Sequence, residues 1–444
     1  MSVADSGSFR MWPGHGLVRW LLLWLLVAVV ATAWPAVQPL FVGYGALLLA
    51  AIALSGLSLA RRPLPTVRRT VAPSLALGEW TEVSLRLEAP EEGGAALEAF
   101  DHYPTESEQR GLPLEATLGA GEVHEHAYRL RPRQRGSFEF GAVEVWMRSP
   151  GDLLRRRAFL GEPQPVRVVP NFRPALQRGL AGIDRQLARL GVHLQRRRGD
   201  GLEFQNLRDY RYGDSMRLVD WKATARRSKL ISREYQDERN QQLMLLIDCG
   251  RRMHAREGDL THFDHVLDAC LLLAYVAGKQ GDATGFQTFA GEPRSLPPVH
   301  GARALPRLLD GLFDLRTTQQ SPDYAAAASR LIEQQQRRAL VLVITNLRDE
   351  DDEEILSAVR TLSRRHVVLV ASVRELTLRR LGDQPVRGFD SALEVAATRL
   401  YLEGRGRTHE ALRSEGAFVL DVEPPELPAS LVQNYLEIKR AGRL

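Results

Sequence analysis

Two long apolar runs near the N-terminus constrain this chain more than any other feature. The first extends from Leu17 to Trp34 and the second from Leu40 to Ala60. Each run has about the length that crosses the hydrocarbon core of a bilayer. The connection between them, Pro35–Pro39, is too short for a domain. We therefore expect a transmembrane helical hairpin, with spans of about 17–34 and 40–60, inside an N-terminal segment 1–66.

Basic residues lie outside both ends of this hairpin and are missing from its turn. Arg10 and Arg19 precede it, and Arg61, Arg62, Arg68 and Arg69 follow it. Since positively charged flanks stay in the cytoplasm, both ends are predicted to be cytoplasmic. A cleaved signal peptide is disfavoured because a second apolar run follows at once. The expected location is the inner (cytoplasmic) membrane, multi-pass, with the body facing the cytoplasm.

Length and composition indicate a folded body with several parts. The chain has 444 residues, enough for about three domains, and its 44% hydrophobic and 25% charged residues are ordinary for globular protein. Cys249 and Cys270 are its cysteines, so no disulfide framework is expected. The net charge of +5 comes from arginine clusters such as Arg155–Arg157, which fit solvated faces or lipid headgroups. This charge is too mild to indicate nucleic-acid binding.

Residues 67–172 read as a small β-sandwich. Short β-rich stretches alternate polar and apolar residues between turn residues. His102, His124 and His126 could suggest a metal, but without a further ligand pair we interpret them as solvated. The expected strands are Thr81–Glu88, Glu122–Leu130, Ser137–Met147 and Pro165–Val169.

After Pro174 the pattern changes to apolar strands that alternate with helices. Such a pattern is typical of a mostly parallel sheet covered on both faces, a doubly wound α/β domain, here at 241–444. The expected strands are Leu243–Asp248, Ala283–Phe289, Leu340–Thr345, Val367–Ser372 and Ala417–Val422. The expected helices are Phe263–Lys279, Ala302–Asp314, Asp323–Arg337 and Asp351–Arg364.

Between these parts, 173–240 is expected to hold a linker helix and a stretch dense in charged and aromatic residues. We call its residues 199–234 the signature segment. Its marked positions are Glu203, Phe204, Arg208, Tyr210, Gly213, Asp214, Arg217, Asp220, Trp221 and Arg226.

The signature segment resembles that of a bacterial family known as domain of unknown function 58. The resemblance implies a membrane hairpin and a β-sandwich before the segment and a von Willebrand factor type A-like domain after it. It also implies a partnership with a MoxR-type AAA+ ATPase. The biochemical activity of this family is not established.

Two interpretations of the signature segment stay open. Its mixed charges could form Arg–carboxylate pairs that staple a connector, with Trp221 as a buried apolar anchor. Alternatively, they could form a docking surface for a partner. Catalysis is disfavoured because the segment has no histidine and no paired nucleophile and base.

Type A domains often bind a divalent cation through a D-x-S-x-S loop, and the equivalent loop here is degenerate. Asp248 is kept, whereas Gly250 and Arg252 replace the serines and Asn346 stands at the later aspartate position. Lost oxygen ligands and an added guanidinium both disfavour Mg²⁺. We expect no metal and no cofactor, and Asp248 is expected to pair with Arg251 or Arg252 or to cap the following turn. Cys249 is disfavoured as a nucleophile.

The sequence therefore predicts a non-enzymatic, membrane-anchored cytoplasmic scaffold or adaptor that partners a MoxR-type AAA+ ATPase. The alternative is a metal-dependent ligand-binding receptor of the von Willebrand factor type A kind. The degenerate loop disfavours that alternative. A hydrolase is disfavoured as well, because the sequence has no recognisable catalytic triad.

Overall fold

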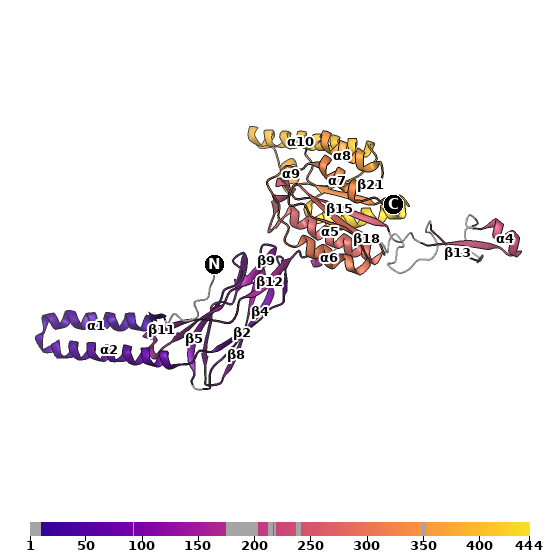
Figure 1. Ribbon diagram of the computed structural model, residues 1–444. Coiled ribbons are helices and arrows are strands. Elements are labelled where there is room, and N and C mark those ends of the chain that lie inside the picture. The colour runs from indigo at the N-terminus through magenta and orange to yellow at the C-terminus, as the bar shows by residue number, and fades with distance from the viewer. Residues whose placement is uncertain are drawn as a thin grey trace. The chain divides into compact units, whose positions relative to one another are not determined.

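The computed structural model describes residues 10–91, 93–174, 203–211, 216, 219–236, 241–348 and 352–444 (Figure 1). The chain divides into two compact units, Met1–Val169 and Pro170–Leu444, and each is described here by itself. The finer division at 66, 172 and 240 stays a prediction.

The first unit contains two antiparallel helices, α1 (His15–Ala33) and α2 (Gln38–Arg61), joined by the 3-10 turn η1 (Pro35–Val37). Trp24 stacks on Phe41 with ring centroids 5.0 Å apart. Leucines such as Leu25 and Leu47 expose 62% and 70% of their surface, which water would disfavour and lipid would accept. Both helices are long and apolar enough to cross a membrane. Each begins slightly before the predicted apolar run.

The rest of this unit is rich in β-strands. One sheet has the order β1–β11–β10–β5–β7, a second β2–β4–β8–β6, and a third β3–β12–β9. The alternation of β4 buries Val83, Leu85 and Leu87 completely. The strands are β1 (Arg10–Pro13), β2 (Thr66–Thr70), β3 (Ser74–Ala76), β4 (Thr81–Glu88), β5 (Ala95–Asp101), β6 (Ser107–Arg110), β7 (Leu114–Leu118), β8 (Val123–Pro132), β9 (Gly136–Phe140), β10 (Val143–Arg148), β11 (Leu154–Leu160) and β12 (Gln164–Val169).

The predicted single strand Ser137–Met147 is wrong, because it comprises two strands in different sheets. The chain leaves the first of them at Gly141, whose N–H donates to the carbonyl of His102 at 2.7 Å. The Gly141 carbonyl accepts from Arg69 Nη2 at 2.6 Å. These bonds to other segments replace the ladder, so β9 ends at Phe140 and β10 starts at Val143.

The second unit contains a six-stranded sheet of order β19–β18–β15–β20–β21–β22. All neighbours pair in parallel except β19 with β18. The strands are β15 (Gln242–Asp248), β18 (Ala283–Phe289), β19 (Ser295–His300), β20 (Leu340–Thr345), β21 (Val367–Val373) and β22 (Phe418–Val422). A small hairpin, β16 (Arg256–Glu257) and β17 (Leu260–Thr261), follows β15.

Helices cover both faces of this sheet, so the doubly wound α/β expectation is confirmed at that level (Figure 1). One core lies under α5 (His262–Lys279), α6 (Ala304–Leu312) and α11 (Leu427–Arg440). The other includes side chains of α7 (Tyr324–Gln334), α8 (Asp352–Ser363) and α10 (Phe389–Ser414). The helix α9 (Leu376–Asp383) precedes α10. β19, α9, α10 and α11 were not predicted.

The signature segment, which could have been a stapled connector, forms a β-hairpin that we call the signature hairpin. β13 (Glu203–Asp209) pairs antiparallel with β14 (Ile231–Gln236), and the short helix α4 (Trp221–Arg227) lies between them in the chain. The predicted linker helix falls mostly outside the described residues.

Candidate functional site

The carboxyl ends of β15 and β20 meet at the switch point of the sheet, where doubly wound folds commonly bind ligands. Asp248 ends β15 and is fully buried. Its Oδ2 accepts a 2.6 Å hydrogen bond from Thr345 Oγ1, and Thr345 Oγ1 lies 3.0 Å from Tyr324 Oη. Both oxygens of the carboxylate are used, because Oδ1 accepts from the Gly250 N–H at 2.7 Å. Asp248 therefore caps the turn that follows it, which is the second of the two roles expected for it.

The other positions of the degenerate loop lie at the same edge of the sheet. Arg252 is 6% exposed and donates from Nη1 to the Asn346 carbonyl at 3.4 Å. Asn346 is buried and donates from Nδ2 to Glu375 Oε1 at 2.7 Å. Among the described residues, no group of three His, Cys, Asp or Glu side chains is placed to hold a metal. The prediction of no metal stays a prediction.

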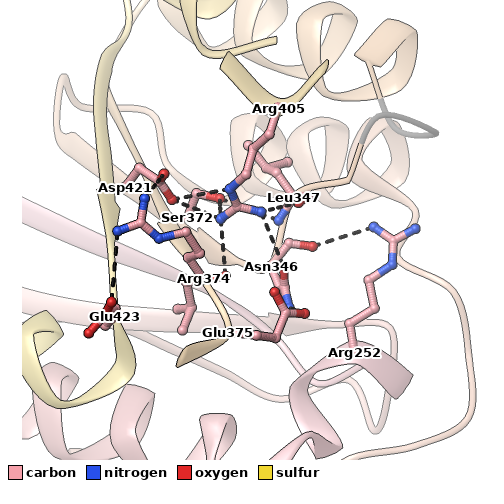
Figure 2. A network of polar contacts seen from close by, with 10 residues as sticks. Arg252, Asn346, Leu347, Ser372, Arg374, Glu375, Arg405, Asp421 and Glu423 are labelled. Carbon is pink, nitrogen blue, oxygen red and sulfur yellow. Dashed lines mark hydrogen bonds and ion pairs between the residues drawn. The ribbon is translucent and has the colours of Figure 1, made fainter. Parts of the chain in front are cut away.

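A buried arginine, Arg405, dominates this edge (Figure 2). It extends from α10 and exposes 1% of its surface. Its guanidinium donates to Asp421 Oδ1 at 2.9 Å, to Ser372 Oγ at 2.5 Å and to the Val373 carbonyl at 3.1 Å. Further bonds reach Asn346 Oδ1 at 3.3 Å and the Leu347 carbonyl. One cation thus joins the ends of β20, β21 and β22 to α10.

Further charges surround this cluster at the end of β22. Arg374 Nη1 lies 3.5 Å from Asp421 Oδ2, and Glu423 Oε2 lies 3.1 Å from Arg379 Nη1. Burial lowers the pKa of His409 to about 4; Asp421 acts in the opposite direction and Arg405 adds to the lowering. His409 is therefore neutral at physiological pH. The polar groups at this edge bind one another, which favours a structural role over catalysis.

Both cysteines are unsuited to nucleophilic chemistry. Cys249 and Cys270 are fully buried, and burial raises the pKa of the Cys270 thiol. His254, which follows Cys249 closely in sequence, has its Nδ1 3.0 Å from Thr317 Oγ1.

The signature hairpin presents a different kind of surface. Asp220 caps α4 by accepting from the Ala223 N–H at 3.0 Å, and Thr224 Oγ1 accepts from the Ile231 N–H at 3.0 Å. The second of these bonds holds the helix against β14. None of the α4 residues is buried.

Exposed apolar and basic side chains occur together on this hairpin. Trp221 is 61% exposed, Met216 55% and Leu230 42%. Trp221 is therefore not a buried anchor, and that prediction is wrong: it is the first residue of a helix with no buried face. The exposed basic residues are Arg211, Lys222, Arg226, Arg227 and Lys229.

The remaining signature positions are described unevenly. Tyr210 is half-buried, and its N–H donates to the Leu230 carbonyl at 2.9 Å. The backbones of Glu203, Phe204 and Arg208 lie in β13. Gly213, Asp214 and Arg217 lie outside the described residues.

Sequence reasoning missed Arg405 and the contacts that it makes with Ser372, Asp421 and Asn346. Ser372, Asp421 and Asn346 are far from Arg405 in the chain, and α10 was not predicted. The isolated arginine between Gly404 and Gly406 gives no pattern that would identify it as buried.

These observations define a membrane-associated protein with a β-rich first unit and a doubly wound α/β domain. Residues 206–416 match the family described as "Protein of unknown function DUF58". The resemblance seen in the signature segment is confirmed, because this part of the chain matches the DUF58 family.

Solved structures show weak likenesses. An aerotolerance-related membrane protein from Bacteroides fragilis is 16% identical, with 45% of this chain and 99% of that chain covered at a TM-score of 0.31. The CARDB domain of a Pyrococcus furiosus protein is 12% identical, with 24% and 95% covered at a TM-score of 0.17. Likenesses this weak carry no argument about fold or function. The chain has no match among curated proteins.

Proposed function

We propose that this protein is a non-enzymatic, membrane-anchored scaffold or adaptor whose signature hairpin docks a cytoplasmic partner. The observation that carries the proposal is the exposed Trp221, accompanied by Met216 and Leu230 among basic side chains. Tryptophan and arginine are enriched at the energetic centres of protein interfaces. A surface of this kind fits a partner with an acidic rim around an apolar pocket.

The proposed partner is a MoxR-type AAA+ ATPase, as the family resemblance implies. We also propose that the chain spans the inner membrane with more than one helix and that its body faces the cytoplasm. The arginines that flank the helical hairpin support this orientation. We further propose that the α/β domain is of the von Willebrand factor type A kind. Two features support this. The sheet has an antiparallel edge strand, β19, and β15, its first strand along the chain, ends in an aspartate.

The proposal is tested by co-purification with the ATPase from detergent-solubilised membranes, with and without nucleotide. The variant Arg226→Glu reverses an exposed charge on α4, and the matched control Arg330→Glu reverses an exposed charge on α7. We expect the Arg226→Glu variant to lose the co-purified ATPase. Its melting temperature should match that of the unmodified protein, because exposed charges contribute little to stability. The control should retain the ATPase. Equal recovery with both variants would show that the hairpin does not dock it.

A further inference from the structure

The membrane helices are fixed to the first β-sheet through several direct contacts. β1 leads directly into α1 and pairs with β11, with Trp12 opposite Arg155 and Pro13 opposite Leu154. The N–H of Gly14 donates to the Leu153 carbonyl at 2.9 Å, and that of His15 to Asp152 Oδ2 at 3.1 Å. A Cβ atom at Gly16 would lie 1.9 Å from the Gly151 carbonyl oxygen, so this approach requires glycine.

The end of α2 is fixed to the same sheet. Arg156 Nη1 donates to the carbonyls of Leu59 and Arg62 at 3.0 and 2.8 Å. A Cβ atom at Gly56 would lie 3.5 Å from Leu154 Cδ1 and 3.7 Å from Met11 Sδ. The paired edge β1–β11 therefore lies beside the last turns of a membrane helix.

Helix length sets the depth of this edge in the bilayer. α1 has 19 residues, and at 1.5 Å per residue it spans about 28 Å, close to the hydrocarbon thickness of about 30 Å. α1 therefore has no spare turn between β1 and the bilayer. Trp12, three residues before His15, lies at most about 10 Å further along an extended strand, at the level of the headgroups.

The residues at this level are those that favour an anionic interface. Trp12 is 45% exposed, and tryptophan is enriched where hydrocarbon meets water. Arg19 and Arg61 are exposed near the same helix ends, and Arg62 is half-buried. The nearby carboxylates of Asp152 and Glu98 pair with Arg155, at 2.8 and 3.8 Å. With Arg155, the three arginines at the helix ends outnumber these two carboxylates.

We propose that the β1–β11 edge, with the adjoining helix ends, is a binding surface for the anionic headgroups of the bilayer that α1 and α2 span. Trp12 lies in the headgroup layer, and Arg61 contacts lipid phosphate. The occupant is the lipid surface, because this edge is continuous with the two membrane helices. The proposal rests on α1 and α2 crossing the membrane and is independent of the ATPase partner.

The depth of Trp12 is tested with the full chain in vesicles of lipids brominated next to the headgroup. The chain has seven tryptophans, so the signal of Trp12 is the fluorescence difference between the unmodified protein and Trp12→Phe. We expect this difference signal to be quenched by brominated lipid. If it equals the signal in unbrominated lipid, Trp12 is not in the headgroup layer and the proposal is wrong.

Lipid selectivity is tested by the association of spin-labelled phosphatidylglycerol relative to phosphatidylcholine. A basic residue near an anionic surface contributes about 1 kcal/mol, which is about fivefold, so Arg61→Gln should lower the preference by about two- to fivefold. The matched control Arg110→Gln removes an exposed arginine that stacks on Trp80 at 4.6 Å, on β6 of another sheet. It should leave the preference unchanged. An equal loss in both variants, or none in either, would contradict the proposal.

Discussion

Arg405 shows how a single residue can organise the end of a sheet. A buried cation is costly unless it is paired, and this one has acceptors on two strands, β21 and β22, and in the segment after β20. The guanidinium is planar and its donors point in fixed directions, so its acceptors must be held at matching positions. Its role is therefore to fix α10 over the carboxyl ends of the strands.

We expect Arg405→Met to destabilise the fold strongly, because it removes the donor that Asp421, Ser372 and the Leu347 and Val373 carbonyls share. Removing one partner of a buried ion pair typically costs about 3 to 5 kcal/mol. The urea midpoint of the solubilised full chain measures this loss. The control Arg360→Ala breaks the exposed Arg360–Glu415 pair at 2.7 Å and should change the midpoint little. Similar midpoints for the two variants would contradict the role assigned to Arg405.

The low pKa of His409 predicts a pH dependence of stability. Its ordinary pKa is 6.5 and burial lowers it to about 4, so between these values the unfolded chain binds more protons than the folded one. Stability is unaffected by this group above pH 6.5 and falls as the pH drops from 6.5 to 4. In His409→Gln this part of the decline should be missing from the unfolding free energy measured against pH. Identical pH profiles would mean that His409 titrates normally.

At the scale of elements, the strongly patterned segments were predictable and the weakly patterned ones were not. β4, β18 and β20 have the predicted bounds, because their apolar residues are either alternating or continuous. α10 was missed because much of its length is polar and few of its residues are buried. β19 was missed because it contains Pro297 and Pro298, which are tolerated at the edge of a sheet.

In the candidate site, too, some residues could be predicted from the sequence and others could not. Asp248 and Asn346 could be located because each follows a predictable buried strand. The Arg405 cluster could not, since its partners meet only after the strands are ordered in the sheet. The exposure of Trp221 could not be foreseen either, because it depends on α4 having no buried face.

The attachment of α2 to the sheet predicts a local effect at the end of that helix. Arg156→Met keeps most of the side-chain volume but removes the donors to the Leu59 and Arg62 carbonyls. Hydrogen bonds to charged groups contribute about 1.5 to 3 kcal/mol each, so hydrogen exchange in the last turn of α2 and in β11 should accelerate at least tenfold. The control Arg86→Met replaces an exposed arginine on β4, in another sheet, and should leave this exchange unchanged. Unaltered exchange in Arg156→Met would contradict this attachment.

At the scale of the whole molecule, the proposed topology places both ends of the chain in the cytoplasm. The arginines on both flanks of the hairpin are its physical reason. A reporter that is active only in the periplasm, fused after Leu444, should remain silent, whereas one fused into the turn at Pro35–Pro39 should be active. Activity of the C-terminal fusion would overturn the topology and, with it, access to a cytoplasmic ATPase.

The central claim is that the signature hairpin is where the partner binds, and the affinity of Trp221→Ala for the MoxR-type ATPase tests it most directly. Truncating an interface tryptophan of this kind typically costs about 2 kcal/mol or more, which corresponds to about thirtyfold in the dissociation constant. Phe389→Ala is the matched control, since Phe389 is an 82% exposed aromatic on α10 of the same unit. We predict that Trp221→Ala weakens binding by at least thirtyfold with an unchanged melting temperature, while Phe389→Ala binds normally. Normal binding by Trp221→Ala, or equal weakening by both variants, would contradict the claim.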